Sequence, residues 1–131
     1  MPRKISRKGL VKKLDTIFSI YIRLRDSDKN GFCKCISCKK KYHYKDVDAG
    51  HFIGRRHLAT RFDPKNVYAQ CRYCNRYVAG NQYLYSLSLE KKESGLPAKL
   101  LKKSRKTIKL SNDDLLSLIN KYKILVEELN K

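Results

Sequence analysis

Two cysteine pairs with the same short spacing constrain the fold of this chain more than any other feature. Cys35-x-x-Cys38 and Cys71-x-x-Cys74 are separated by residues 39–70. A two-residue spacer lets one tight turn supply two thiolates, and two such turns complete the four-cysteine tetrahedron that zinc favours. A pair of disulfides or four buried core cysteines are the alternatives, and neither explains why both pairs share one spacing. We therefore predict a structural zinc ion bound by these four cysteines.

A four-thiolate site leaves zinc no open coordination position, so this metal would hold structure and perform no chemistry. It would hold residues 35–38 next to residues 71–74. The chain between them, residues 39–70, would then be fixed at both ends, and we call it the platform. Cys33 could compete for the metal, but residues 33 and 35 on a strand stand about 7 Å apart, too far to share one ion easily. We interpret Cys33 as a packing residue.

The charge balance indicates a polyanionic partner. Lysine and arginine total 31 against 12 acidic residues, which leaves a net charge of +19 over 131 residues. The same balance fits ribosomal, membrane-surface and heparin-binding proteins, but nucleic acid is the partner that it favours most.

The sequence gives no sign of a membrane or secretory protein. It has no run of about 18 apolar residues that could span a bilayer. Lys13 and Asp15 interrupt the apolar stretch that a secretory signal would need after the basic start. We expect a cytoplasmic protein, and in that compartment grouped cysteines more often bind metal than form disulfides.

The hydrophobic pattern predicts helices at both ends of the chain. Residues 10–26 carry apolar side chains three and four apart, with basic residues mostly between them. The final helix has a clearer start, because Ser111 is a natural N-cap with Asp114 three residues later. A further short helix is expected at Pro97, followed by a basic linker over residues 102–106. The first and last helices could pair between chains or fold back on the core, and we favour folding back.

The middle of the chain is typical of short strands. Residues 32–52 show strand-like runs around the cysteines and are interpreted as a hairpin. Residues 66–70 follow an Asp63-Pro64 turn and are predicted to form another strand. Residues 54–65 have no clear period and are expected to form a loop.

After Cys71 the pattern becomes helical and pauses at Gly80-Asn81, where Asn81 could cap a new helix that stops near Gly95. The chain is thus predicted to be a single α+β domain of residues 1–131. Its parts are an N-terminal helix (10–26), a zinc-stapled core (32–94) and a C-terminal helical extension (97–131).

Three residues in and beside the platform suggest a specific chemistry. His51 lies in the first strand, Asn66 opens the next, and Asn75 directly follows the second Cys-x-x-Cys. This order resembles the HNH, or ββα-metal, nuclease motif in its His-Asn-Asn form. More narrowly, the stretches FSIYIRLRD, CISCKK and DAGHFIGRRHLATRFDPKNVYAQCRYCNRYVAGNQYLYS resemble the phage recombination protein NinG family, also called Rap, over roughly residues 17–87.

The resemblance implies an HNH-like ββα-metal core and a divalent-metal-dependent endonuclease that hydrolyses phosphodiester bonds. His51 would accept the proton of the attacking water, since imidazole titrates near neutral pH. Asn75 corresponds to the family's ligand for the catalytic ion, and its amide oxygen suits Mg²⁺ or Mn²⁺. Asn66 would orient the histidine or the loop.

Gly50 departs from the broader HNH pattern, in which many members have an acidic metal ligand immediately before the histidine. Asp48 is the nearest substitute, because residues 48 and 50 face the same side of a strand, about 7 Å apart. The glycine could leave room for a water molecule between them. Asp48 is therefore a candidate ligand of the catalytic ion together with Asn75.

Each candidate also has a purely structural interpretation. His51 could be a structural or solvated histidine, Asn66 a turn residue, and Asn75 a residue at a helix start with no metal role. His43 and His57 are interpreted as structural, although His57 lies in the loop and could touch phosphate.

Six cations surround the proposed site in the sequence and are candidate DNA contacts, since guanidinium groups match phosphate geometry with two parallel donors: Arg55, Arg56, Arg61, Lys65, Arg72 and Arg76. Contacts of this kind position a backbone without reading bases, so we expect recognition of DNA shape.

The resemblance also implies a phage or prophage protein that acts in a bacterial host on branched recombination intermediates, such as Holliday junctions or D-loops. Phage or host recombination proteins are candidate partners, and a two-fold symmetric junction would suit a homodimer. The main rival is a non-catalytic zinc module that binds DNA or a recombination partner through charge alone. A third hypothesis is an RNA-binding accessory protein.

Overall fold

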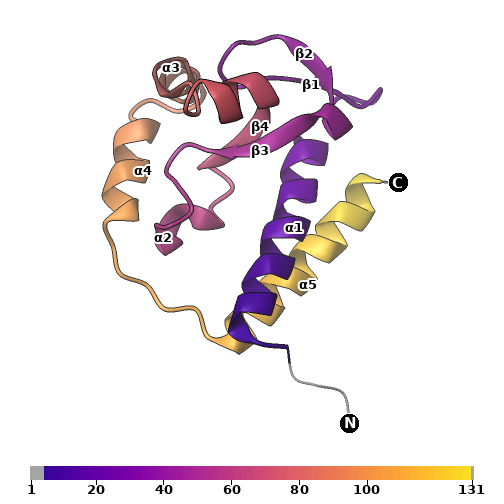
Figure 1. The fold of residues 1–131 in the computed structure, drawn as a ribbon, viewed down its shortest axis with the longest axis vertical. Helices are drawn as coiled ribbons and strands as arrows, with labels where there is room; N and C mark the ends of the chain where they lie inside the picture. The colour runs from indigo at the N-terminus through magenta and orange to yellow at the C-terminus, as the bar shows by residue number, and fades with distance from the viewer. Residues whose placement is uncertain (1–4, 131) are drawn as a thin grey trace.

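The computed structural model describes residues 5–130, which form an α+β fold of helices around two short β-ribbons (Figure 1). The elements in chain order are α1 (Arg7–Arg25), β1 (Phe32–Lys34), β2 (Lys41–His43), the 3-10 turn η1 (Tyr44–Asp46), β3 (Val47–His51), α2 (Leu58–Arg61), β4 (Val67–Cys71), the π-helix η2 (Tyr73–Tyr77), α3 (Gln82–Lys92), α4 (Leu96–Ser104) and α5 (Asn112–Leu129). The α+β class expected from the sequence is confirmed. Among the described residues, no helix combines the length and apolar character that crossing a bilayer requires.

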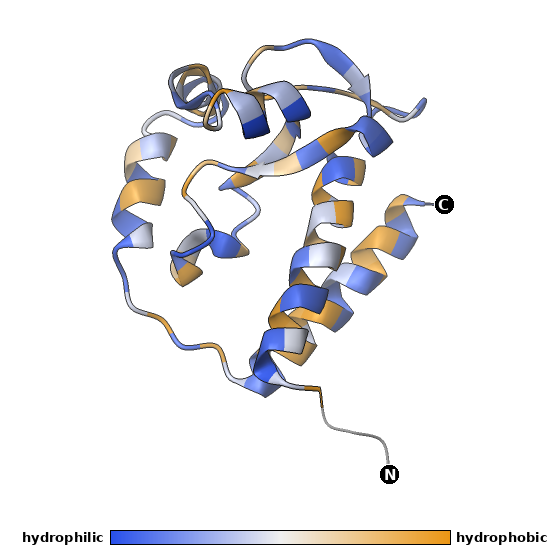
Figure 2. Cartoon of the chain, in the orientation of Figure 1, coloured by the Kyte–Doolittle hydropathy of each residue, from blue (hydrophilic) through white to orange (hydrophobic). Residues whose placement is uncertain are grey.

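The first and last helices pack against each other within the chain (Figure 1). Buried side chains recur every four residues along α1, from Leu10 to Ile22, so they form one stripe along the helix. That stripe meets the buried face of α5, where the rings of Phe18 and Tyr122 lie 5.0 Å apart in an edge-to-face arrangement. Figure 2 shows the corresponding alternation of apolar and polar residues along both helices. Folding back, as favoured from the sequence, is the observed arrangement.

Both helices begin with side-chain caps. The Ser6 hydroxyl accepts a hydrogen bond from the Gly9 amide and starts α1 three residues before the predicted position. Ser111 forms the predicted N-cap of α5, and with Asp114 it completes a capping box. Local sequence is sufficient to set these helix starts, because each cap bonds within three residues of itself.

The strands form two antiparallel pairs and not the single hairpin expected for residues 32–52. β1 pairs with β2, whereas β3 pairs with β4 in the register Asp48–Gln70, Ala49–Ala69, Gly50–Tyr68 and His51–Val67. The predicted hairpin is present as β1–β2, but it does not extend to residue 52, because this segment holds a third strand. The third strand bonds to a partner across the loop, which local pattern does not specify.

The β3–β4 ribbon lies between two hydrophobic clusters. Ala49 and Val67 face α1 and α5 in the first cluster. Tyr68 packs on the other side against a second cluster formed by α3, α4 and Ile36. The buried hydroxyl of Tyr85 in α3 accepts from the Tyr68 amide at 3.1 Å and donates to the Gly50 carbonyl at 2.6 Å. This one side chain therefore fixes both strands.

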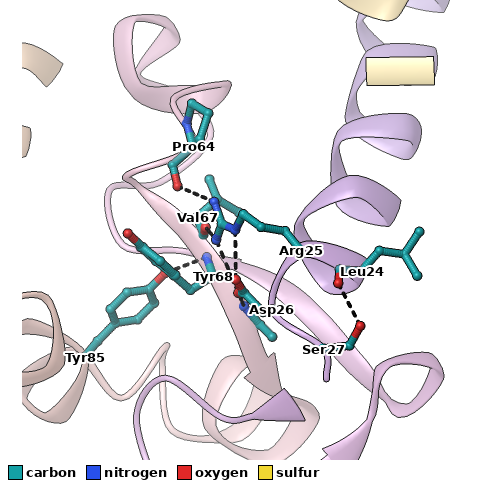
Figure 3. A network of polar contacts seen from close by, with 9 residues as sticks. Leu24, Arg25, Asp26, Ser27, Pro64, Val67, Tyr68 and Tyr85 are labelled. Carbon is teal, nitrogen blue, oxygen red and sulfur yellow. Dashed lines mark hydrogen bonds and ion pairs between the residues drawn. The ribbon is translucent and has the colours of Figure 1, made fainter. Parts of the chain in front are cut away.

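A polar clamp joins the end of α1 to β4 (Figure 3). The Arg25 guanidinium donates to the carbonyl oxygens of Pro64 and Val67, each at 2.8 Å, and pairs with Asp26. Asp26 in turn accepts from the Ala69 amide at 2.7 Å. The clamp holds the start of β4 against α1, directly beside the loop that carries the candidate residues.

Three further elements differ from the sequence-based expectation. The loop of residues 54–65 contains the short helix α2, and part of the predicted linker at residues 102–106 belongs to α4. Asn81 precedes α3, but it has a left-handed backbone and makes no side-chain cap. Its side chain bonds elsewhere, to the Cys74 sulfur at 3.4 Å.

Candidate functional site

The four cysteines of the two Cys-x-x-Cys pairs meet in one cluster. The Sγ atoms of Cys35, Cys38, Cys71 and Cys74 all lie within 4.8 Å of one another, and those of Cys38 and Cys71 are 3.9 Å apart. Four sulfurs at 2.3 Å around a tetrahedral zinc ion would stand about 3.8 Å apart. The cluster is therefore compatible with structural zinc, as the spacing predicted.

Backbone amides and one side chain surround these sulfurs with donors. The Cys38 amide donates to the Cys35 sulfur at 3.5 Å, and the Cys74 amide donates to the Cys71 sulfur at 3.4 Å. Asn81 supplies a third donor, to Cys74. Such bonds stabilise thiolates and orient metal ligands. Burial raises the pKa of Cys35, but amide donors outweigh it and hold that pKa below its usual value.

Cys33 stays outside the cluster. Its side chain is buried with Val47 and Ala69, and its sulfur lies 3.5 Å from the Tyr42 carbonyl oxygen. Burial raises the pKa of this thiol to about 11. The prediction that Cys33 is a packing residue agrees with this position.

A polar cleft of about 610 Å³ lies along the free edge of β3 and beside η2. We call it the β3–η2 cleft. It brings together six residues singled out from the sequence, namely Asp48, His51, Arg55, Arg72, Asn75 and Arg76. Asp48 and His51 reach it from β3, whereas Arg72 and Asn75 reach it from the segment that carries Cys71 and Cys74. The cysteine cluster thus fixes one wall of the cleft relative to the other.

His51 is held in one orientation by a backbone carbonyl. Its Nε2 atom lies 2.9 Å from the carbonyl oxygen of Arg61, and that oxygen can only accept, so the proton is on Nε2. Nδ1 is then left as the acceptor nitrogen of the ring. Burial, assisted by the charge of Arg55, lowers the pKa of His51 to about 4, although the bond to Arg61 opposes this shift. The imidazole is therefore neutral at physiological pH.

Asp48 is a partly buried carboxylate with three donors. Arg76 binds both of its oxygens, at 2.9 and 2.8 Å, and Asn75 Nδ2 donates to Oδ2 at 2.9 Å. Burial raises the pKa of Asp48, but the hydrogen bonds from Arg76 and Asn75 outweigh it, so the pKa of this carboxyl is below its usual value. Asn75 uses its amide nitrogen here, which leaves its amide oxygen as the remaining ligand atom.

Asn66 lies beneath the loop and not in the cleft. It is fully buried, accepts from the Ile53 amide at 2.8 Å, and donates to the carbonyl oxygens of Ile53 and Thr60 at 3.0 and 3.1 Å. These bonds tie the two ends of the loop that follows His51. Of the two roles that the resemblance allowed, orienting the loop matches these contacts.

The space beside Gly50 is filled by protein. A Cβ atom at this position would lie 2.1 Å from Oε1 of Gln70, whose side chain is fully buried and donates to the Gly80 carbonyl oxygen. The hypothesis that the glycine leaves room for water is therefore corrected: the glycine makes room for Gln70. Asp48 remains the carboxylate of the cleft.

Three of the six candidate cations do not line the cleft. Arg61 pairs with Asp15 of α1, its Nε lying 3.1 Å from Oδ1. Lys65 pairs with Glu93, and Arg56 is an exposed neighbour of His57. These pairings join segments 28 to 46 residues apart, so charge alone in the sequence could not separate them from Arg55, Arg72 and Arg76.

Sequence reasoning missed three polar residues of the cleft. Ser19 and Arg23 reach it from α1, and Lys45 from η1. Arg23 donates to the carbonyl oxygens of Ser19 and Tyr44, which holds its guanidinium against the cleft wall. Arg23 lies four residues after Ser19 on α1, so helical spacing placed them on one face, but nothing local indicated what that face meets.

The fold and the site define a small, strongly basic α+β protein in which a four-cysteine cluster that could hold a metal ion lies beside a polar cleft. A family model described as bacteriophage lambda NinG protein matches residues 3–131. The chain belongs to the NinG family. No curated protein and no solved structure matches it significantly.

Proposed function

We propose that this chain is an HNH-type, divalent-metal-dependent DNA endonuclease that acts in phage recombination. The observation that carries the proposal is the meeting of His51, Asp48 and Asn75 in one cleft with three arginines, a residue type that suits phosphate recognition. These are the group types that phosphodiester hydrolysis needs, namely a neutral base, oxygen ligands for a hard cation, and cationic contacts to phosphate.

In this mechanism His51 is the general base. Its Nδ1 accepts a proton from the attacking water, while the Arg61 carbonyl at Nε2 stabilises the imidazolium that forms. The pKa of about 4 keeps the ring neutral before reaction. A base of this kind is always available at neutral pH, although its intrinsic proton affinity is modest.

Asp48 and Asn75 fit a hard divalent ion by the chemistry of their oxygens. The carboxylate of Asp48 and the amide oxygen of Asn75 would hold Mg²⁺ or Mn²⁺, which supplies Lewis-acid polarisation of the phosphate when bound. The Asn75-to-Asp48 hydrogen bond places these two side chains together without using the amide oxygen. Asn66 orients the loop after His51.

Arg55, Arg72 and Arg76 contact the phosphate backbone in this proposal, with Arg23 and Lys45 as additional cations. The four-cysteine zinc site is structural and holds η2 in place. Branched DNA of the Holliday junction or D-loop type is the substrate implied by the family resemblance, and recombination proteins of phage or host are the implied partners. A bacterial cytoplasm is the implied compartment. Because the buried stripes of α1 and α5 pack on each other within one chain, a homodimer would have to use other faces of the protein.

A non-catalytic DNA-binding zinc module remains the second candidate, and one contact favours it. Asp48 is the cleft's carboxylate, and both of its oxygens are bound by Arg76. Among the described residues, three or more His, Cys, Asp or Glu side chains come within metal-binding distance of one another in the cysteine cluster and not around Asp48. A protein that only binds DNA would keep the Asp48–Arg76 pair.

Substitution of His51 separates the two candidates. Linear, flapped, looped and four-way DNA substrates are incubated with zinc-loaded protein, with and without added Mg²⁺ or Mn²⁺. We expect His51→Ala to lose cleavage while it keeps DNA affinity, and the control His57→Ala to keep both. Unchanged cutting by His51→Ala would remove this residue from the mechanism. Absence of metal-dependent cutting by the wild type would favour the binding module. Structured RNA as competitor at the same salt concentration tests the RNA-binding hypothesis.

A further inference from the structure

Two tyrosines of η2 expose their rings to solvent beside the proposed site. Tyr73 is 67% exposed and Tyr77 is 79% exposed. Their ring centroids lie 6.3 Å apart, and the ring planes are 24° from parallel. Large aromatic groups usually bury most of their area. The fold itself leaves both of these near-parallel rings uncovered.

The π-helix decides which way each side chain of η2 faces. Cys74 points inward to the sulfur cluster, and Asn75 points to Asp48 in the cleft. Residues four apart fall on nearly the same side of a helical turn, and single π-turns are frequent at functional sites. This spacing brings Tyr73 next to Tyr77, and Arg72 and Arg76 both line the cleft.

Each tyrosine is therefore adjacent in sequence to an arginine that lines the cleft. Arg76 reaches Asp48, and Arg72 donates to the Lys45 carbonyl oxygen at 3.1 Å, so both guanidinium groups are anchored at the cleft wall. Both rings thus lie one residue along the chain from a guanidinium group of the cleft.

The surrounding charge indicates what could cover the rings. The sequence from Pro64 to Leu89 holds no acidic residue, whereas it carries three cations. Cationic groups interleaved with exposed aromatic rings are the combination that binds single-stranded nucleic acid, because the cations track the backbone and bases stack on the rings. Bases of an intact duplex are already stacked on each other and cannot use such a surface.

We infer that Tyr73 and Tyr77 form a stacking surface for unpaired nucleobases of a DNA strand that also contacts the β3–η2 cleft. The inference rests on the proposed function for its choice of DNA as the ligand, and it specifies the substrate class as DNA with unpaired bases near the scissile phosphate. Stacking selects such DNA without base-specific hydrogen bonds.

The test measures binding in the His51→Ala background, so that no strand is cut. The probes are a single-stranded oligonucleotide that contains 2-aminopurine and a duplex of the same length, at one fixed salt concentration. We expect Tyr73→Ala/Tyr77→Ala to weaken single-strand binding roughly tenfold or more. It should also abolish the quenching of 2-aminopurine, and duplex affinity should change less than twofold. Both rings are exposed, so the fold and the zinc content should be retained.

Two matched variants complete the design. Tyr73→Phe/Tyr77→Phe keeps the rings and should bind single strands like the parent. Tyr83→Ala removes an equally exposed ring, 74% exposed, from α3 and should leave quenching unchanged. The inference would be overturned if Tyr73→Ala/Tyr77→Ala lost duplex and single-strand binding equally. It would also be overturned if this variant bound single strands as well as the parent does. Those outcomes leave the proposed nuclease standing if His51→Ala still abolishes cleavage, so the two proposals fail separately.

Discussion

The Nδ2 atom of Asn75 lies 2.9 Å from Oδ2 of Asp48, which links the π-helix η2 to the strand β3 across the β3–η2 cleft. The two residues are 27 positions apart in the chain, and the bond joins the segment after the second Cys-x-x-Cys to the strand that carries His51. Arg76 binds the same carboxylate from the same helix. The state of this small network therefore determines whether Asp48 is free to bind a cation.

Arg76 should compete with a divalent ion for Asp48. In zinc-loaded protein we expect Arg76→Gln to bind Mn²⁺ more tightly than the wild type, because the substitution removes the cation that occupies both oxygens of Asp48. Titration of free Mn²⁺ by electron paramagnetic resonance measures the change. Arg72→Gln is the control, since this arginine contacts the Lys45 carbonyl and not Asp48. Equal Mn²⁺ affinity in both variants and the wild type would mean that Asp48 is not a ligand.

The buried neutral state of His51 should make stability depend on pH. The folded-state pKa of about 4 lies below the usual value of 6.5, so the unfolded chain binds more protons between these two values. This contribution is complete above pH 6.5 and is lost as the pH falls toward 4; its upper limit is about 3 kcal/mol. The free energy of unfolding, measured by urea denaturation, should fall between pH 7 and pH 5 in the wild type. We expect it to fall less over the same range in His51→Gln. Parallel curves for the two proteins would contradict the burial argument, since other acid effects are common to both.

The same pKa predicts the shape of the activity profile of the proposed nuclease. Titration of His51 should add almost no pH dependence to the cleavage rate between pH 6 and 8. The rate should fall as the pH drops through about 4, where His51 becomes protonated. Single-turnover rates at saturating metal provide the measurement. An acid limb centred near pH 6.5 would show that the histidine titrates as if it were exposed to water.

The cysteine cluster should bind one zinc ion per chain and support folding. Cys74→Ser removes one of four ligands, so we expect loss of bound zinc together with loss of cooperative unfolding. Cys33→Ala is the matched control, because this buried cysteine packs with Val47 and Ala69 outside the cluster and should retain zinc. Metal analysis and circular dichroism test both variants. A well-folded wild-type protein without metal would refute the structural role of zinc.

Gly50 should resist substitution because Gln70 occupies the space above it. A Cβ atom would meet Oε1 at 2.1 Å, and the buried Gln70 cannot move freely since it donates to Gly80 and Ser37. We expect Gly50→Ala to lower the free energy of unfolding by about 1–3 kcal/mol. In the Gln70→Ala background the same change should cost much less. A double-mutant cycle in urea measures this coupling, and additive costs would exclude the predicted clash.

The sequence by itself determined the features that depend on near neighbours. The spacing of Cys35-x-x-Cys38 and Cys71-x-x-Cys74 predicted a four-sulfur cluster, because each pair is formed by a single turn. Ser111 and Asp114 predicted the start of α5 for the same reason, and the apolar repeat of α1 predicted a buried stripe. Each of these rests on bonds or periods within a few residues.

Only the tertiary structure decided which distant segments meet. β3 pairs with β4 and not with its neighbours in the chain, and Arg61 bonds Asp15 while Arg76 bonds Asp48. Two arginines of identical chemistry thus take different positions, one paired with α1 and one in the cleft. Gln70 fills the space over Gly50 in the same way. Such choices depend on packing between residues 16 or more positions apart. Local propensity and charge do not encode them, because many pairings of equal local quality compete until the core selects one.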